Sequence, residues 1–380
     1  MEDQYPLFLR NNRPRPSDLT RLGYEVSAFG RGPKITILLP IFEPEQLGET
    51  LDSVLRQAYP NWELCVACKA SDGERVGRIL GERDVLEGRL EVAYRDAGAA
   101  GLSNAALSLA TGEFAGVLGC GDKLAPEALF EVAKSLRDRP DAVLVYTDED
   151  KIDGEGRRSQ PHFKPGWSPD LLLAADYVSS LSVYRRSFLE KAGGFREELE
   201  GAHGHDLALR ATEDPGSIHH LPGVLYHRRT PSGPDSGWSK EHARQAVAEA
   251  LERRGLEGSV EDGLLPDRFR VRYEVAGRPL VSIVIPTRDN VSMLKNCVES
   301  IERLTTYTNY EILIVDNDSV DPETVEYLAS TPHRVERFRE EFNYSRINNF
   351  AVARARGEYV LLLNDDTEVI SGGWLEAMLE

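Results

Sequence analysis

Two stretches of the chain share one pattern, in which an apolar run follows Gly-Glu and ends in a polar turn. The first is 112–124, GEFAGVLGCGDKL, and the second is 357–370, GEYVLLLNDDTEVI, about 245 residues later. Tyr359–Leu363 is continuously apolar, which is typical of a strand buried on both faces of a parallel sheet. Because open α/β sheets bind ligands at the carboxyl ends of their strands, the acids after this strand predict a binding site.

The pattern around the first stretch predicts alternating strands and helices. Short apolar runs indicate strands, and apolar residues at spacings of three and four indicate helices between them. Strand, helix and strand in this order, with short connections, predict an α/β domain with a mostly parallel sheet flanked by helices. The predicted strands are 35–40, 63–67, 90–94, 113–118 and 143–146, and the predicted helices include 47–58, 103–110 and one that opens at Pro126.

The second stretch belongs to a second copy of this pattern, so the chain is a tandem repeat. No counterpart of 143–230 follows in the second copy. We therefore expect the second domain to be incomplete, as in a truncated chain. The matching segments are 35–40 with 281–286, 61–63 with 309–311, and 104–121 with 349–366.

Changes in composition along the chain predict its domain boundaries. The stretch 154–230 is rich in His, Trp and Tyr and is expected to shape an acceptor pocket. Ser239 is expected to cap a helix that ends at Gly255. The expected segments are a surface leader without periodicity at 1–33, a first domain at 34–235, a helix with a connector at 236–279, and a second domain at 280–380.

Charge and composition exclude some classes of protein. Lys and Arg number 45 and Asp and Glu 63, giving a formal net charge of −18 at pH 7, which argues against a nucleic-acid partner. We expect a cytoplasmic protein without a signal peptide, and peripheral contact with the inner face of the membrane stays open. The four cysteines form no disulfide framework, and Cys65 and Cys68 lie in a strand-like run that favours neither a redox nor a zinc site.

Together these features resemble the family 2 glycosyltransferases, which are inverting enzymes with the GT-A fold that use nucleotide-diphospho-sugars. The tandem arrangement resembles enzymes of bacterial surface-polysaccharide assembly, and the resemblance covers 35–380 apart from the connector. An N-x-A-x-x-x-A-x-G-E-Y/F run occurs in both copies. The other motifs that carry the resemblance are Pro40 with Glu43, Pro286 with Asp289, Val315–Ser319, Asn364–Asp366 at the D-x-D position, TDEDK at 147–151, Gly193–Phe195 and Leu221–His227.

For the second copy, the resemblance implies a donor site with a divalent cation, Mg²⁺ or Mn²⁺. The diphosphate of the donor leaves with growing negative charge, and a hard cation held by carboxylate oxygens neutralises it. The implied metal ligands are Asp366 and Asn364. A competing interpretation is that these acids merely form turns, where Asp and Asn are favoured. The implied nucleotide-binding residues are Pro40, Glu43, Pro286, Asp289, Asp316 and Asp318.

The first copy has lost residues at three places in the same site. Cys68 and Ala70 stand where the second copy has Asp316 and Asp318, and 119–121 (GCG) replaces the D-x-D position. The general base of the family lies in a stretch resembling E-G-S-Q-D-Y-D-L, which here reads EGAHGHDL. The base position is therefore Gly204, which has no side chain to take a proton. We expect a degenerate, non-catalytic first domain.

A rewired site in the first domain is the alternative. Histidines in such numbers are more often core or surface residues than ligands, which favours the degenerate interpretation. The residues that could rebuild a site are Asp206, Asp148 and Glu149 as bases, Asp122 and His227 as metal ligands, and His203 and His205 beside them.

The sequence thus predicts transfer of a sugar from a nucleotide sugar to a glycan or lipid-linked acceptor in polysaccharide biosynthesis. Other polysaccharide-assembly enzymes are the expected partners, and the 380-residue chain alone is expected to be weakly active or inactive. The alternative function is a non-catalytic module that binds a glycan or a partner on a GT-A scaffold. A dehydrogenase is disfavoured because no G-x-G-x-x-G follows either first strand, whereas a nucleotidyltransferase would share the architecture.

Overall fold

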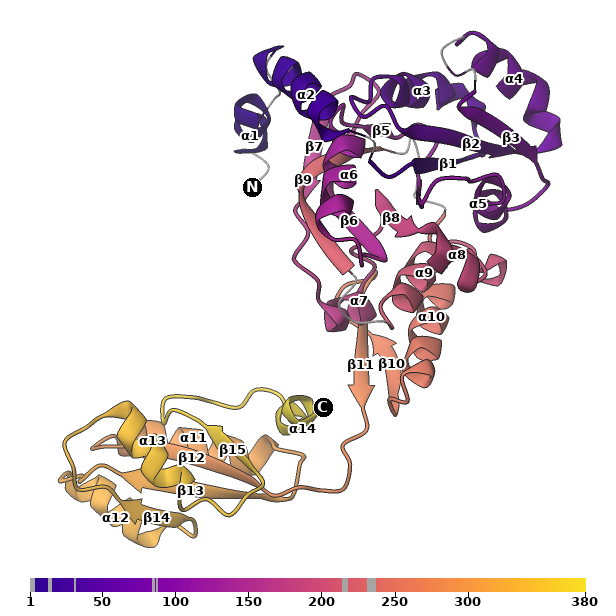
Figure 1. Cartoon of the computed structure of the whole chain (residues 1–380). Helices are drawn as coiled ribbons and strands as arrows, with labels where there is room; N and C mark the ends of the chain where they lie inside the picture. Colours follow the sequence, from indigo (N-terminus) through magenta and orange to yellow (C-terminus); the bar gives the residue numbers. More distant parts are fainter. Residues whose placement is uncertain are drawn as a thin grey trace. The chain divides into compact units, whose positions relative to one another are not determined.

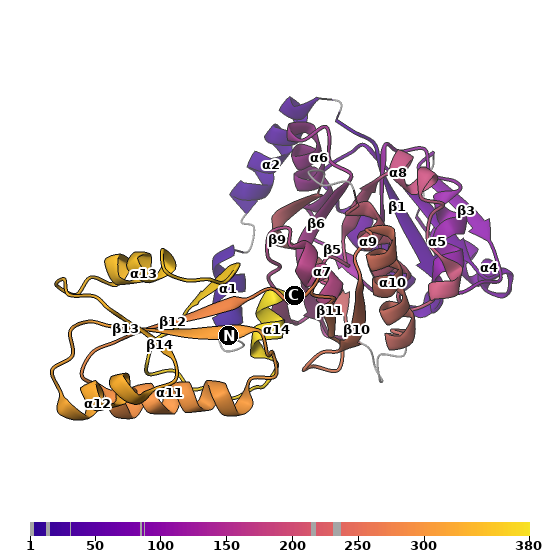
Figure 2. The same ribbon diagram turned by 90° about the horizontal axis from the view of Figure 1, so that it is seen from below.

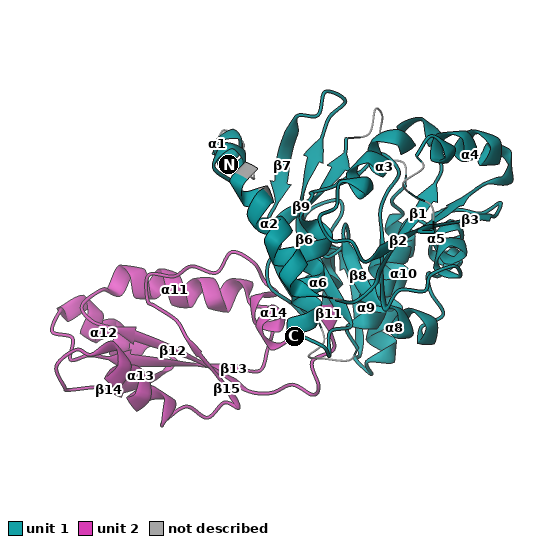
Figure 3. Ribbon diagram, turned by 45° about the horizontal axis from the view of Figure 1, so that its top comes forward, with its two compact units in different colours: residues 1–271 teal, residues 272–380 magenta. Residues whose placement is uncertain are grey.

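The chain folds into two compact units. The computed structural model describes residues 4–12, 16–30, 32–83, 86, 88–213, 218–230 and 237–380. The two units are Met1–Val271, here called unit 1, and Arg272–Glu380, called unit 2 (Figure 3).

Unit 1 is organised around one sheet, which has nine strands among the described residues (Figure 1). They are β1 (Ile35–Ile41), β2 (Trp62–Cys68), β3 (Leu90–Tyr94), β4 (Phe114–Val117), β5 (Lys123–Leu124), β6 (Leu144–Ile152), β7 (Arg158–His162), β8 (Ser182–Arg185) and β9 (Ile218–Arg229). Their order is β3-β2-β1-β4-β8-β6-β9-β5, with β7 paired to β6. Only β5, β7 and β8 run antiparallel to their neighbours. The predicted mostly parallel sheet is confirmed.

Helices flank both faces of this sheet (Figures 1 and 2). Side chains of α3, α4 and α6 share one core cluster with β1 and β2, and α5 contacts β1 and β2 on the opposite face. Ser239 caps α10 as predicted, because its side chain accepts the N–H of His242. The helices are α1 (Tyr5–Asn12), α2 (Pro16–Phe29), α3 (Leu47–Leu55), α4 (Gly73–Gly81), α5 (Ala99–Leu107), α6 (Ala128–Asp138), α7 (Pro169–Ala174), α8 (Arg186–Lys191), α9 (His203–Ala211) and α10 (Lys240–Arg253).

Unit 2 repeats the first part of unit 1. Its parallel sheet has the order β14-β13-β12-β15, and Val281 pairs with Tyr310 and Tyr359 just as Ile35 pairs with Trp62 and Phe114. The connector before it carries a two-stranded sheet of β10 (Gly258–Asp262) and β11 (Phe269–Tyr273). The elements of unit 2 are β12 (Val281–Thr287), α11 (Val291–Leu304), β13 (Tyr310–Asp316), α12 (Pro322–Ser330), β14 (Arg334–Arg337), α13 (Tyr344–Val352), β15 (Tyr359–Leu362) and α14 (Trp374–Leu379).

The repeat extends to a polar clamp at the amino edge of each sheet, which is buried in unit 1 and partly buried in unit 2. In unit 1, the Glu63 carboxylate accepts hydrogen bonds from Thr36 Oγ1 at 2.6 Å and from the backbone N–H of Gly112 at 2.8 Å, and it pairs with Lys34. In unit 2, Glu311 accepts from Ser282 Oγ at 2.6 Å and from the N–H of Arg356 at 2.8 Å, and the latter bond corresponds to that from the N–H of Thr111 to Glu63 at 2.6 Å. These two acids therefore hold the strands together.

The clamp predicts an acid-sensitive contribution to stability. The hydrogen bonds of Glu63 outweigh the opposing effect of burial and lower its pKa from 4.5 to about 2. Its contribution is therefore full above pH 4.5 and is lost as the pH falls towards 2. We expect Glu63→Gln to lower the free energy of unfolding by about 2–3 kcal/mol at pH 7, and by progressively less below pH 4.5.

Urea unfolding between pH 7 and pH 3 checks this expectation. Glu74→Gln, whose side chain is 92% exposed on α4, is the matched control and should change stability by less than about 0.5 kcal/mol. Equal stability of Glu63→Gln and the wild type at pH 7 would refute the role of the clamp.

The leader is a first correction to the sequence analysis, because it contains the helices α1 and α2. Leu22, Val26 and Phe29 pack against the core from α2, at helical spacings of four and three. Tyr5 of α1 is buried and donates a hydrogen bond to Asp150 Oδ2 at 2.5 Å. The spacing of Leu22, Val26 and Phe29 could have predicted α2 from the sequence, although this apolar pattern is short and is flanked by polar residues.

The strand β15 is a second correction, because it is not buried on both faces. Tyr359, Val360 and Leu362 are 49%, 37% and 43% exposed. β15 pairs only with β12 among the described residues, whereas its equivalent β4 in unit 1 lies between β1 and β8. The exposure follows from this edge position: the described part of unit 2 has no counterpart of β8.

Candidate functional site

The predicted acids of unit 2 gather at the carboxyl edge of its sheet. Asp289 follows β12, Asp316 ends β13 and Asp318 comes two residues later, while Asn364 and Asp366 follow β15. β13, β12 and β15 are neighbouring parallel strands, so their carboxyl ends meet at one edge. This edge is where open α/β sheets bind ligands.

Asp289 fixes the loop that follows β13. Its Oδ1 accepts the backbone N–H groups of Val320 at 2.6 Å and Asp321 at 2.7 Å. These bonds, with that from Asp321 the stronger influence, lower the pKa of Asp289 and keep it ionised. Asp289 and Asp318 both have left-handed backbones, with φ of 50° and 58°. Such conformations cost free energy in residues other than glycine and cluster at functional sites.

Asp316 is the buried member of the set. Its side chain is completely buried, Oδ1 accepts the N–H of Ser319 at 2.8 Å, and Oδ2 lies 3.2 Å from Nε of Arg337. Asn317 beside it donates to the carbonyl oxygens of Phe338 and Glu340. Asp316 therefore orders the strand end, while Asp318 is exposed.

At the D-x-D position, Asp365 is hydrogen-bonded within the protein, whereas Asn364 and Asp366 are exposed. Asp365 Oδ2 accepts a hydrogen bond from Thr287 Oγ1 at 2.7 Å, which ties the loop to β12. No cluster of three or more His, Cys, Asp or Glu side chains that could hold a metal ion occurs in the described part of the chain. One exposed carboxylate still fits Mg²⁺ or Mn²⁺, because such ions take one or two protein carboxylates together with substrate phosphates.

Unit 1 has a crevice of about 650 Å³ at the corresponding edge of its own sheet. Its walls come from the ends of β1 and β4 on one side and from the segments around α7, α9 and β9 on the other. The lining includes Phe42, Gly119, Asp176, His203, Gly204 and Trp238. The crevice is therefore lined by Gly119, from the loop that corresponds to the D-x-D position, and by Gly204, the predicted position of the base.

In unit 1, the loop that corresponds to the D-x-D position contains two closely packed glycines. A Cβ atom at Gly119 would collide with the carboxylate of Asp122, and one at Gly121 would collide with the amide oxygen of Gln46. Gly121 also has a φ of 96°, which a residue with a side chain rarely adopts. Asp122 is turned into the protein, where it accepts hydrogen bonds from the Tyr226 hydroxyl and from the N–H of Arg229, and burial raises its pKa.

Two of the candidate bases in unit 1 are engaged in the structure. Asp206 is fully buried and accepts from Arg196 Nη2 at 2.6 Å and Arg210 Nε at 2.9 Å. Asp148 accepts the N–H groups of Lys164 at 2.8 Å and Gly223 at 2.9 Å. Neither carboxylate lines the crevice.

Glu149 takes part in a buried brace that the sequence analysis missed. It lies 3.6 Å from the ammonium group of Lys164, whose side chain is completely buried. Lys164 Nζ donates to the carbonyl oxygens of Ser179 at 2.5 Å and Ser180 at 3.3 Å. Ser180 and Leu181 have left-handed backbones, with φ of 71° and 43°, and Ser180 lines the crevice. We refer to the Glu149–Lys164 pair as the brace, because Lys164 holds the segment Ser179–Ser180 at one wall of the crevice.

His227 lies outside the crevice. Its Nδ1 is 2.7 Å from Asp150 Oδ1, and the other oxygen of Asp150 accepts from Tyr5 of α1. Side chains alternate along a strand, so the neighbours Tyr226 and Arg228 line the crevice and His227 does not. The structure therefore does not bring His227 together with Asp122.

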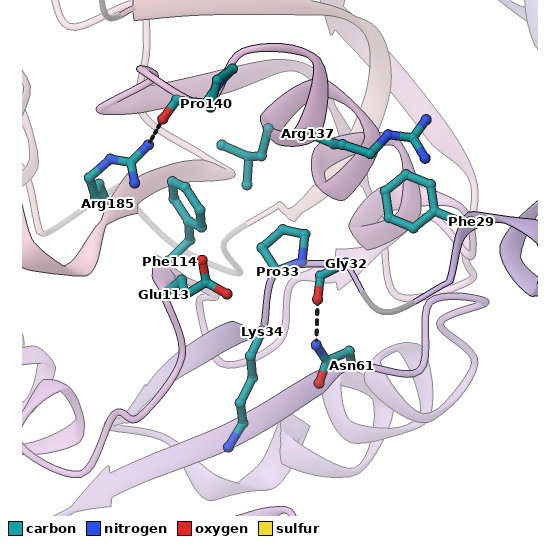
Figure 4. Close-up of a pocket in the computed structure, with 11 residues that line it drawn as sticks. Phe29, Gly32, Pro33, Lys34, Asn61, Glu113, Phe114, Arg137, Pro140 and Arg185 are labelled. Carbon is teal, nitrogen blue, oxygen red and sulfur yellow. Dashed lines mark hydrogen bonds between the residues drawn. The ribbon is translucent and has the colours of Figure 1, made fainter.

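A second hollow of about 510 Å³ lies at the opposite, amino edge of the sheet of unit 1 (Figure 4). Several of its polar groups already have partners. Asn61 Nδ2 donates to the carbonyl oxygen of Gly32 at 2.7 Å, and Arg185 donates to those of Pro140 and Ala142. Arg137 lies over the ring of Phe29 at 4.0 Å. This hollow holds none of the predicted site residues, so the carboxyl edge remains the candidate site.

Comparison with known proteins identifies the family. The family model of glycosyl transferase family 2 matches residues 36–193 and 282–380. The chain belongs to this family. The predicted family and its GT-A fold are thereby confirmed. No helix in the described ranges is long and apolar enough to cross a membrane.

Two curated relatives of this family 2 chain align along nearly all of it. The uncharacterized protein y4gI of Sinorhizobium fredii is 40% identical over 94% of this chain and 42% of its own length. The O-antigen biosynthesis protein RfbC of Myxococcus xanthus is 38% identical over 96% of this chain and 30% of its own. The chain thus spans less than half the length of either relative. A crystal structure of S. aureus TarS 1–349 with UDP-GlcNAc gives a TM-score of 0.48 at 20% identity, over 57% of this chain and 66% of that one.

The loop that corresponds to the D-x-D position yields a prediction for reversion of the first family 2 unit. We expect Gly121→Asp to lower the free energy of unfolding by about 1–3 kcal/mol, because of its left-handed backbone and the clash with Gln46. It should not create a Mn²⁺ site in unit 1. Thermal unfolding with and without Mn²⁺ checks both points, with Gly77→Asp on α4, where a Cβ meets no atom within 4 Å, as the control. A Mn²⁺-dependent rise of the unfolding temperature specific to Gly121→Asp would contradict the prediction.

Proposed function

We propose that this chain is part of the machinery that transfers sugars in polysaccharide biosynthesis, with its donor site in unit 2. The carrying observation is that Asp289, Asp316, Asp318 and Asp366 come from three strand ends to one edge of one sheet. The donor would be a nucleotide-diphospho-sugar and the acceptor a glycan or lipid-linked glycan. The relative named for O-antigen biosynthesis supports this class of process.

We assign separate roles to the acids of unit 2. Asp366, with Asn364 beside it, would hold Mg²⁺ or Mn²⁺ together with the donor diphosphate. When bound, the cation neutralises charge on the leaving diphosphate. Asp318 and Asp289 would face the nucleotide, while buried Asp316 orders the loop between them. Pro286 lies at the end of β12, opposite Val315 of β13.

Family 2 chemistry also needs a base that takes the proton of the attacking acceptor hydroxyl. In unit 1 that position is Gly204, and the candidate bases Asp148 and Asp206 are held by other partners and do not line the crevice. The two carboxylates that do line it also accept hydrogen bonds, Asp176 from Ser179 and Glu200 from the N–H groups of Ala99 and Ala100. The described part of unit 2 contains no counterpart of the segments that form the acceptor side in unit 1. We therefore propose that this 380-residue chain alone transfers sugar weakly or not at all.

The test is a transfer assay with UDP-sugars and GDP-sugars, Mn²⁺ and a bacterial polysaccharide acceptor. The proposal expects the donors to bind but to turn over at no more than background rates. Robust Mn²⁺-dependent transfer by this chain would contradict the proposed weak activity. Transfer that persists in Asp366→Ala would contradict the assignment of the donor site to unit 2.

A further inference from the structure

We propose that the crevice of unit 1 binds a neutral sugar residue of a glycan, without nucleotide, metal or chemistry. This inference rests on the proposed function only in taking a glycan as the acceptor class. It assigns a role to the first domain, which has lost the residues for transfer but has kept a cavity of about 650 Å³. A cavity of this size suits one or two sugar rings.

The crevice has a wall that the protein maintains at a cost. Ser180 and Leu181 are left-handed in succession, and each such residue costs of order 1–3 kcal/mol. Buried Lys164 holds the carbonyl oxygens of this segment, and burying its charge beside Glu149 costs several kcal/mol before the pair forms. A crevice wall that contains strained backbone and depends on a buried ion pair indicates a binding surface that is still in use, rather than a cavity left over from a lost active site.

The side chains around the crevice suit a sugar. Phe42 and Trp238 are 43% and 44% exposed at its lining, and aromatic faces bind the apolar C–H faces of sugar rings. His203 Nδ1 is buried without a hydrogen-bond partner among the described residues. Burial lowers the pKa of His203, so the ring is neutral at pH 7 and can exchange a hydrogen bond with a hydroxyl. Asp176 and Ser179 add polar groups beside it.

The charges of the crevice disfavour a nucleotide diphosphate. The carboxylate of Glu200 occupies the amino end of α5, where it accepts the N–H groups of Ala99 at 2.8 Å and Ala100 at 3.2 Å. A phosphate would otherwise use these donors. Glu200 and Asp176 together outnumber the cation of Arg228 in the lining. A neutral ligand therefore fits better than an anion.

The experiment is saturation-transfer NMR of the whole chain with methyl glycosides of glucose, galactose, mannose, rhamnose and N-acetylglucosamine, in EDTA. We expect at least one to bind with a Kd in the millimolar range, and Trp238→Ala and His203→Ala each to weaken binding about tenfold or more. Tyr24→Ala, which removes an exposed aromatic ring on α2, is the matched control and should have no effect. Unchanged unfolding temperatures establish that the variants are folded.

The outcomes separate this inference from the proposed function. Binding of no glycoside, or binding that survives both crevice variants, overturns the inference. So does binding that requires Mn²⁺ or is lost in Asp366→Ala, because it would then belong to unit 2. Binding of the donor nucleotide with Mn²⁺ is measured separately in Trp238→Ala. If the variant still binds it, the proposed donor site in unit 2 stands even when the inference about the crevice fails.

Discussion

Replacing Lys164 by methionine is expected to lower the free energy of unfolding of unit 1 by about 3–5 kcal/mol. The change removes the ammonium group beside the Glu149 carboxylate, one of whose oxygens already lacks a hydrogen bond, and leaves the His162 ring at 3.7 Å as its one ionic partner among the described residues. It also removes the donor that holds the carbonyl oxygens of Ser179 and Ser180. Burial lowers the pKa of Lys164, and the charge of Glu149 opposes this effect.

Urea unfolding followed by tryptophan fluorescence measures this loss, because three of the four tryptophans lie in unit 1. The double variant Lys164→Met with Glu149→Gln should recover a large part of the stability, since no unpaired charge stays buried. Lys134→Met, at a half-exposed pair on α6, should change stability by less than about 0.5 kcal/mol. A loss below about 1 kcal/mol in Lys164→Met would show that the brace is not needed.

Asp366→Ala is expected to weaken Mn²⁺-dependent binding of the donor nucleotide by roughly 30-fold to 100-fold. The physical reason is that Asp366 is the exposed carboxylate at the end of β15, whereas Asp365 is already engaged by Thr287. The affinity that remains should equal that of the wild type in EDTA. Thermal unfolding should be unchanged, because Asp366 has no structural partner in the described residues that its loss would leave unpaired.

Fluorescence titration with a UDP-sugar and a GDP-sugar, with Mn²⁺ or EDTA, measures this effect. Glu368→Ala, another exposed acid two residues further along, is the matched control and should retain the affinity of the wild type. Equal weakening in the two variants would point to general charge instead of a metal ligand.

The repeated pattern gave most of the architecture in advance, because apolar strands and their turns depend on local sequence. The registers of Ile35 with Trp62 and of Val281 with Tyr310 agree with the predicted match of the two copies. The acids of unit 2 reach one edge for the same reason: they directly follow parallel strands. The loss of a metal loop at glycines 119 and 121 stays a prediction, and the structure adds that a Cβ atom at either position would collide with a neighbouring side chain.

Features that depend on tertiary contacts were not visible in the sequence. The exposure of Val360 depends on which strand lies beside β15, and an apolar run does not show this. α5 begins at Ala99, inside a Gly-rich stretch that predicts a loop, because Glu200 caps it from about a hundred residues away. Lys164 and Glu149 meet only in the folded chain, so the sequence offered Asp148 and Glu149 of TDEDK only as candidate bases of a rewired site and did not show their contacts with Lys164.

The central claim is that the donor site lies in unit 2 alone, and calorimetric titration tests it most directly through stoichiometry. A UDP-sugar or GDP-sugar is titrated into the wild-type chain and into Asp366→Ala, both with Mn²⁺. The account predicts one nucleotide site per chain, and loss of its heat in the variant. Two sites per chain, or one site whose heat survives in Asp366→Ala, would contradict it.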